Sequence, residues 1–236
     1  MINYKLISYL VILAGLLFSR CSESPKNKCS EFYDNYPRII SRMGNSPDTI
    51  LLVNFLSKML DKDSQCLDAL LTRADLYLAV GKVQEAKEDL YRIISLDTGN
   101  VYALFKLGLA FQNESKDYAA LYYFQKAIRI KSRGNTAINY YNQDNGLSDR
   151  KSKYDIDYDL IIYKQGVSFY FNRDLKSSFI NFNYCIQKKF MLDRSYLYRG
   201  AIYLETNRKE SACKDFLEAK KWGSQDAEDY LLHFCK

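Results

Sequence analysis

The sequence predicts an all-α protein built from repeated pairs of helices. The main observation is a pattern of a glycine, a small residue, a phenylalanine and a second small residue that recurs with constant spacing. Its three copies are Gly108, Ala120, Phe124 and Ala127; Gly166, Ser178, Phe182 and Cys185; and Gly200, Ala212, Phe216 and Ala219. The last two copies are offset by 34 residues, a period typical of stacked helix pairs. A step of 34 residues back from the first copy reaches a weaker one, at Ala74, Ala86, Leu90 and Ile93.

Small residues at these places indicate that the two helices of each pair approach each other closely. A Gly or Ala on the first helix leaves room for a small residue on the second, and the Phe fills the space beside them. In this pattern the chain resembles the tetratricopeptide-repeat family over residues 67–134 and 159–226, with two repeat units in each range. The resemblance implies a right-handed α-solenoid whose first helices line a concave groove.

Two segments that flank the repeats are expected to cap them. Residues 46–66 are predicted to form an N-terminal capping helix or a degenerate half-repeat, with Ser46 as its N-cap. Residues 227–236 are predicted to form a C-terminal capping helix, which begins close to Asp226. Repeat arrays need such caps because the end units would otherwise expose their apolar faces to water.

A polar insertion, residues 135–158, separates the two pairs of repeats. It is rich in Asn, Asp and Tyr and shows no sustained helical period. Loops of this length are uncommon in compact domains unless they are functional or mobile. The insertion is therefore interpreted either as a surface loop or as a lid that contacts a partner.

The N-terminus resembles the signal peptide of a bacterial lipoprotein. Lys5 precedes an apolar run over residues 6–18, which is shorter than the roughly 20 apolar residues that span a bilayer. The residues that end at Cys21 resemble a lipoprotein processing site, although an Arg stands where a small residue is usual before the Cys. We expect residues 1–20 to be a signal peptide, Cys21 to carry lipid and residues 22–45 to form a tether. A cleaved secretory signal and an uncleaved anchor are the alternatives, and all three place the repeats outside the cytoplasm.

The chain has six cysteines, and setting aside the expected lipid carrier leaves five, so at least one must be free. Cys213 lies on the second helix of the last unit and could face Cys235 on the terminal helix, which makes this pair a candidate disulfide. Cys29 with Cys66 is a weaker candidate. Cys185 takes a place held by alanine in other units, so we interpret it as a buried packing residue.

Composition argues against several classes of function. The net charge is +6, and the basic residues are interspersed with acidic ones rather than gathered in a stripe, so no nucleic-acid partner is expected. His233 is the one histidine, and no glycine-rich phosphate loop or Cys-x-x-Cys pair occurs. We therefore expect no catalytic residues, no cofactor and no metal site.

The family resemblance also implies which side chains face the groove. They are Leu71, Asp75, Tyr102, Phe105, Leu109, Gln112, Tyr163, Val167, Tyr170, Leu197 and Ala201. Some relatives in the family hold acidic C-terminal tails with a clamp of Lys and Asn residues. That clamp is absent here, because its usual positions carry other residues, such as Phe105 and Tyr163. The groove is thus expected to bind an apolar or aromatic peptide or helix, with little dependence on salt. The alternative is that neighbouring helices bury several of these aromatic rings.

Three functions are consistent with such a chain. The main expectation is a protein-binding scaffold tethered to a membrane of the bacterial envelope, by analogy with lipoproteins that carry this repeat. The others are a structural or self-associating module and an accessory binder of glycans or peptidoglycan. The fold by itself does not distinguish them.

Overall fold

The computed structural model describes residues 29, 32, 35, 36, 38 and 39, together with the ranges 48–134 and 154–235. The predicted signal peptide, the lipidation site Cys21, most of the tether and most of the insertion lie outside these residues. The chain forms two compact units, Met1–Leu76 and Tyr77–Lys236, which are described separately. None of the helices in the described ranges is both long enough and apolar enough to cross a membrane.

Unit 1 contains α3 (Thr49–Lys62) and most of α4 (Leu67–Ala79). The prediction that Ser46 caps the first helix is wrong, because Asp48 is the N-cap: one carboxylate oxygen of Asp48 accepts hydrogen bonds from the backbone N–H groups of Ile50 (2.9 Å) and Leu51 (3.2 Å). A carboxylate at this position also interacts favourably with the positive end of the helix dipole.

Unit 1 is also held by a covalent link. Cys29 and Cys66, the weaker of the two candidate pairs, form a disulfide that joins residues 37 positions apart in the sequence. Cys66 directly precedes α4, and its side chain is buried. On α4, the Arg73 guanidinium donates a hydrogen bond to the Ser57 hydroxyl of α3 (2.9 Å).

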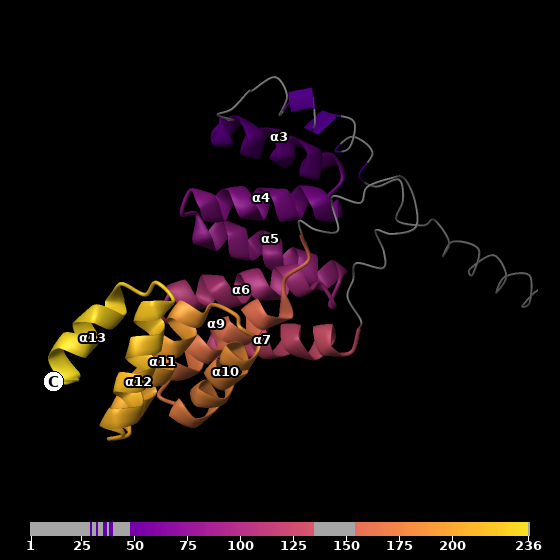
Figure 1. Cartoon of the computed structure of the whole chain (residues 1–236). Helices are drawn as coiled ribbons and strands as arrows, with labels where there is room; N and C mark the ends of the chain where they lie inside the picture. The colour runs from indigo at the N-terminus through magenta and orange to yellow at the C-terminus, as the bar shows by residue number, and fades with distance from the viewer. Residues whose placement is uncertain are drawn as a thin grey trace, which may run out of the picture. The chain divides into compact units, whose positions relative to one another are not determined.

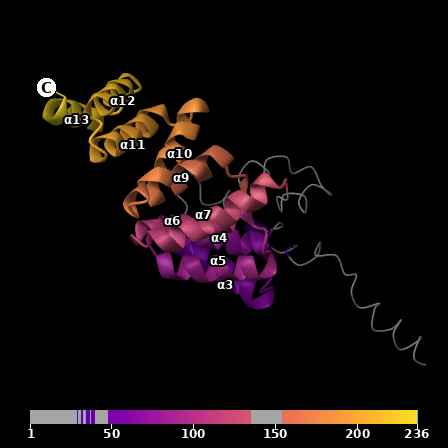
Figure 2. The ribbon, with the colours of Figure 1, turned by 90° about the horizontal axis from the view of Figure 1, so that it is seen from below.

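Unit 2 consists of consecutive helices, which are joined by short turns except between α7 and α9, where most of the predicted insertion lies outside the described residues (Figure 1). They are α5 (Val83–Leu96), α6 (Val101–Asn113), α7 (Asp117–Ser132), α9 (Tyr158–Phe171), α10 (Leu175–Gln187), α11 (Leu192–Glu205), α12 (Lys209–Lys221) and α13 (Asp226–Phe234). The two helices of each pair pack on each other, as α6 does on α7, α9 on α10 and α11 on α12, and α13 covers α12 (Figure 2). The predicted all-α fold of helix pairs is therefore confirmed. Helix α9 begins at Tyr158, the last residue that the prediction assigned to the insertion.

Each pair has the close seam that the repeat pattern predicts. A Cβ added to Gly108 would lie 2.4 Å from an atom of the Phe124 ring, and one added to Gly200 would lie 2.7 Å from the Phe216 ring. Phe124, Phe182 and Phe216 have no exposed surface. The glycines are needed because even a methyl group at these two positions would overlap the ring.

The turns within the pairs repeat as regularly as the seams. Each contains one residue in the left-handed backbone region, and these residues are Gly81, Ser115, Arg173 and Asn207. The next residue in every turn donates its N–H to the carbonyl five residues earlier, as Lys116 does to Phe111 (2.9 Å). This hydrogen bond closes the end of each first helix and sets the antiparallel return of the second.

The C-terminal helix is held to the last pair by the disulfide between Cys213 of α12 and Cys235, with an S–S distance of 2.01 Å. Cys185 is a free thiol without exposed surface, and burial raises the pKa of this thiol to about 12. Disulfides persist mainly in oxidising compartments, so the two pairs indicate a location outside the cytoplasm.

Candidate functional site

The predicted groove residues divide into two groups by burial. The side chains of Leu71, Tyr102, Phe105, Tyr163, Val167 and Ala201 are buried, and those of Asp75, Leu109, Gln112, Tyr170 and Leu197 are partly exposed. Leu71 and Asp75 belong to unit 1. For the first group the structure agrees with the alternative, stated above for the aromatic rings, that neighbouring helices bury these side chains.

Phe105 and Tyr163 show why the aromatic residues were misassigned. Phe105 is 3% exposed, and its ring lies 5.9 Å from that of Phe124, the phenylalanine of its own seam. Tyr163 is 2% exposed and packs in the same way on Phe182, at 5.9 Å between ring centroids. Both rings fill the interior of unit 2, so they stabilise the fold and are not available as binding contacts.

Gln112 and Leu109 also serve the packing of α6. The side-chain amide of Gln112 donates hydrogen bonds to the backbone carbonyl of Lys164 (3.0 Å) and to the hydroxyl of Ser168 (2.8 Å), and so ties α6 to α9. Leu109 packs against the apolar cluster around Phe105 and Phe124. The α6 part of the predicted groove is thus largely taken up by contacts within the chain.

A partly exposed aromatic surface remains on α9, α11 and α13. It comprises Tyr170, Tyr198 and Tyr230, and is called the tyrosine face below. α9 contacts α11, and the rings of Tyr170 and Tyr198 meet edge to face at 5.5 Å. Tyr198 stacks on Phe182 at 4.9 Å, while Tyr230 stacks on Phe216 at 4.6 Å. Two of the seam phenylalanines therefore support the tyrosine face from below.

Polar contacts hold Tyr170 in place at the end of α9. Its hydroxyl donates a hydrogen bond to the Glu205 carboxylate (2.6 Å), whose second oxygen pairs with Arg173 (2.6 Å). Burial, followed by this hydrogen bond, raises the pKa of Tyr170 well above its ordinary value. Because both ends of the side chain are held, the ring is presented in one orientation.

Sequence reasoning missed Tyr198 and Tyr230, and it gave no role to Lys164 of α9. The Lys164 ammonium lies 6.0 Å from the centroid of the Tyr163 ring, and burial, followed by the charge of Arg194, lowers the pKa of Lys164. Lys164 and Tyr198 occupy the same place in their units, two residues before the repeat glycine.

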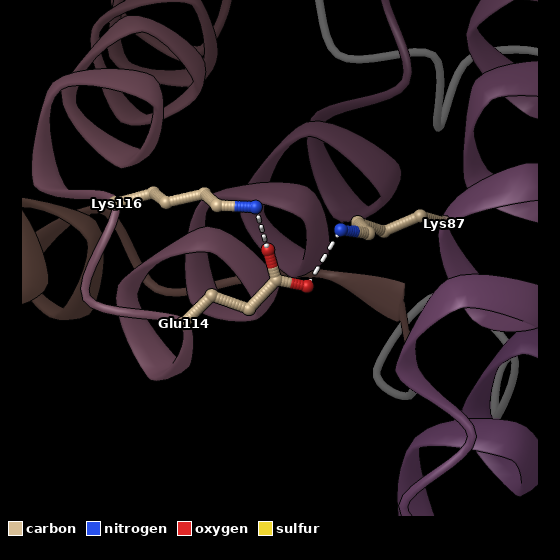
Figure 3. Close-up of polar contacts among 3 residues, drawn as sticks. All are labelled: Lys87, Glu114 and Lys116. Atoms are coloured by element: carbon tan, nitrogen blue, oxygen red, sulfur yellow. Dashed lines mark hydrogen bonds and ion pairs between the residues drawn. The ribbon is translucent and has the colours of Figure 1, made fainter.

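A second polar cluster lies away from the tyrosine face, between α5 and the turn that joins α6 to α7. Glu114 accepts hydrogen bonds from Lys87 (2.6 Å) and Lys116 (2.9 Å), one on each carboxylate oxygen (Figure 3). The bond from Lys87, and then that from Lys116, lower the pKa of Glu114. The Lys87 ammonium also lies 4.8 Å from the centroid of the Phe111 ring. This arrangement joins neighbouring repeats, and a carboxylate held ionised by two lysines is poorly suited to proton transfer.

The arrangement on the tyrosine face is suited to binding rather than to catalysis. Aromatic rings supported from below offer apolar contact area at little entropic cost, and the nearby hydroxyl groups and cations add polar contacts. In the part of the chain that the structure describes, no three His, Cys, Asp or Glu side chains are grouped so that they could hold a metal ion. His233 is exposed on α13.

Solved structures share this fold at low sequence identity. MamA superimposes with a TM-score of 0.62 and 20% identity, over 84% of this chain and 93% of that protein. YrrB, described as a TPR protein with an unusual peptide-binding site, gives a TM-score of 0.62 at 15% identity, over 88% of this chain and 96% of its own. PilF of Pseudomonas aeruginosa gives 0.54 at 16% identity, over 75% of this chain and 71% of its own. No protein-family model and no curated protein matches the sequence. The chain thus has the tetratricopeptide-type helical repeat fold, and the similarity extends to the fold alone.

Proposed function

We propose that this chain is a non-catalytic scaffold of the bacterial envelope that binds a peptide or helix of a partner protein on the tyrosine face. The observation that carries the proposal is the row of partly exposed rings on α9, α11 and α13, each held in a fixed orientation by its neighbours. Side chains of this kind commonly dominate the energy of protein interfaces. The peptide-binding site attributed to YrrB is consistent with the same use of the fold.

Attachment to a membrane is the second part of the proposal. It is supported by the resemblance of residues 1–21 to a lipoprotein signal and by the two disulfides, which suit an oxidising compartment. We expect the mature protein to begin at a lipidated Cys21 and to partition into detergent, since the energy of anchoring comes from acyl chains at about 0.8 kcal/mol per buried methylene. Cys21→Ala should release or mis-sort it. Mass spectrometry that finds Met1 retained or Cys21 unmodified would contradict the lipid anchor.

Site-specific crosslinking tests the binding surface. A photoreactive residue in place of Leu197, which is partly exposed and precedes Tyr198 on α11, should crosslink to one partner in intact envelopes. The same residue in place of Leu217, which is 58% exposed on α12, should not. Once the partner is purified, Leu197→Ala and Tyr170→Ala should each weaken binding by about 2 kcal/mol if they are central contacts, and Leu217→Ala should leave the affinity unchanged. Unchanged affinity in the first two variants, with folding confirmed by circular dichroism, would rule out the tyrosine face as the site.

A further inference from the structure

Helix α13 caps unit 2 at its C-terminal end, and little of it is buried. It packs on α12 (Figure 2), yet Ala227 is the one buried side chain among its nine residues. Gln225, at its N-cap, makes no side-chain hydrogen bond to the helix. The ion pair of Glu228 with Lys220 of α12 (2.8 Å) is exposed to solvent, and such pairs contribute little to stability. Because a helix this short is not stable by itself in water, its position depends on its other links to the chain.

A disulfide and a stacked ring provide those links. The turn after α12 fixes only the first end of α13, and the Cys213–Cys235 disulfide fixes the other end, since Cys235 directly follows the helix. Between the two ends, Tyr230 stacks on Phe216 at 4.6 Å between ring centroids. The disulfide restricts the undocked states of the segment and so favours docking. It thereby keeps Tyr230 in its place on the tyrosine face.

The Cys213–Cys235 disulfide is also more open to thiol attack than the Cys29–Cys66 disulfide. Cys213 and Cys235 are both partly exposed, so the departing thiolate reaches solvent whichever sulfur is attacked. Cys66 is 2% exposed, and an attack on Cys29 would leave the Cys66 thiolate inside unit 1, where burial disfavours the charge. The rate of thiol–disulfide exchange depends on access and on the stability of the departing thiolate. A reductant should therefore open the terminal disulfide first.

We propose that the Cys213–Cys235 disulfide is a redox latch, which a dithiol reductant opens so that α13 leaves α12 and withdraws Tyr230 from the tyrosine face. One thiolate of the reductant attacks a sulfur of the disulfide, and its second thiol then displaces the mixed disulfide. The reductant becomes a disulfide, while two electrons and two protons pass to the thiols of Cys213 and Cys235. The reverse exchange, with a disulfide oxidant, closes the latch.

The latch rests on the proposed function and adds the regulation of its binding surface. With α13 undocked, the tyrosine face retains Tyr170 and Tyr198 but lacks its third ring. Apparent affinity falls in proportion to the fraction of molecules in the competent state. A protein in which α13 is docked about a tenth of the time should therefore bind the partner about tenfold more weakly.

The latch can be tested in the full-length protein without a partner. Replacing Cys213 and Cys235 together with Ser should speed hydrogen exchange of the α13 amides by at least about tenfold. The amides of α6 and α7 should keep their protection, which shows that unit 2 remains folded. Trp222, the one tryptophan of the chain, lies between α12 and α13 and is 52% exposed, so its fluorescence should report the same change. Replacing Cys29 and Cys66 with Ser is the matched control, and it should leave α13 protected. Equal protection of α13 with and without its own disulfide would overturn the latch.

The order of reduction tests the access of the reductant. Dithiothreitol is titrated into the unmodified full-length protein, the free thiols are alkylated, and mass spectrometry identifies them. Cys213 and Cys235 should be alkylated before Cys66. Alkylation of Cys66 at the same or a lower concentration of dithiothreitol would contradict a latch that opens selectively.

Photocrosslinking in intact envelopes tests the effect on binding. With a photoreactive residue in place of Leu197, loss of the Cys213–Cys235 disulfide by substitution with Ser should lower the yield of the partner crosslink by about tenfold. Loss of the Cys29–Cys66 disulfide should leave the yield unchanged. An unchanged yield in the first variant, with α13 shown to be undocked by hydrogen exchange, would overturn the regulation and leave the tyrosine face in place. Absence of a crosslink in every variant would contradict the proposed function and the regulation that rests on it.

Discussion

Replacing Phe216 with Ala is expected to lower the free energy of unfolding by about 3–5 kcal/mol, because the change leaves a cavity in the last seam. Phe216 has no exposed surface, and its ring lies 2.7 Å from where a Cβ on Gly200 would be. The ring of Tyr230, from the terminal helix, stacks on it. Chemical denaturation under non-reducing conditions measures the loss. The complementary change, Gly200→Leu, should overpack the same seam at a cost of about 1–3 kcal/mol.

Leu217→Ala is the control for this prediction. Leu217 is the next residue on α12 and is 58% exposed, so its truncation should change stability by less than about 0.5 kcal/mol. If Phe216→Ala and Gly200→Leu both unfold at the same denaturant concentration as the unmodified protein, the seam does not stabilise the repeats.

Replacing Arg199 with Met is expected to cost about 3–5 kcal/mol, because it leaves the Asp215 carboxylate buried without its partner. The guanidinium of Arg199 on α11 binds both oxygens of Asp215 on α12, at 2.7 and 2.8 Å, and donates a third hydrogen bond to Asn183 on α10 (2.6 Å). The side chain of Asp215 is only 7% exposed. One residue thus joins three helices, and denaturation of the variant should show the loss.

Two further variants make the ion-pair prediction specific. Arg199→Met combined with Asp215→Leu removes both charges and should recover much of the lost stability, since no unpaired ion remains buried. Lys220→Met breaks the exposed pair of Lys220 with Glu228 and should leave the denaturation midpoint where it was. A double variant as unstable as Arg199→Met would show that lost packing, and not the unpaired carboxylate, explains the effect.

Much of the fold was predictable because the repeat pattern reflects packing between residues of the same helix pair, which are close in the sequence. The spacing from Gly200 to Phe216 spans a single helix pair, so the two residues meet whenever that pair forms. The terminal disulfide was a candidate for a similar reason, since Cys213 lies on α12 and Cys235 directly follows α13, the next helix. The cap of α3 was misplaced from Asp48 to Ser46 because both residue types are good N-caps and only the backbone path selects between them.

The binding surface was less predictable, and Phe105, Tyr163 and Tyr170 illustrate the reason. All three are aromatic residues on first helices, at places that the family resemblance assigns to the groove. Phe105 and Tyr163 are buried against the phenylalanines of their own seams, whereas Tyr170 lies near the end of α9 and keeps part of its ring exposed. A first helix in such an array has neighbours on several sides. Its sequence alone does not say which side each ring faces.

The sequence by itself determined the helix pairs, their period and the seams, because these depend on residues within one repeat unit. Only the tertiary structure decided which side chains remain available to a partner. Tyr170 and Tyr198 are separated by a complete helix, α10, and their rings meet at 5.5 Å because α9 packs against α11. Contacts between units depend on how each helix is rotated in the stack, and that rotation results from all the packed surfaces together.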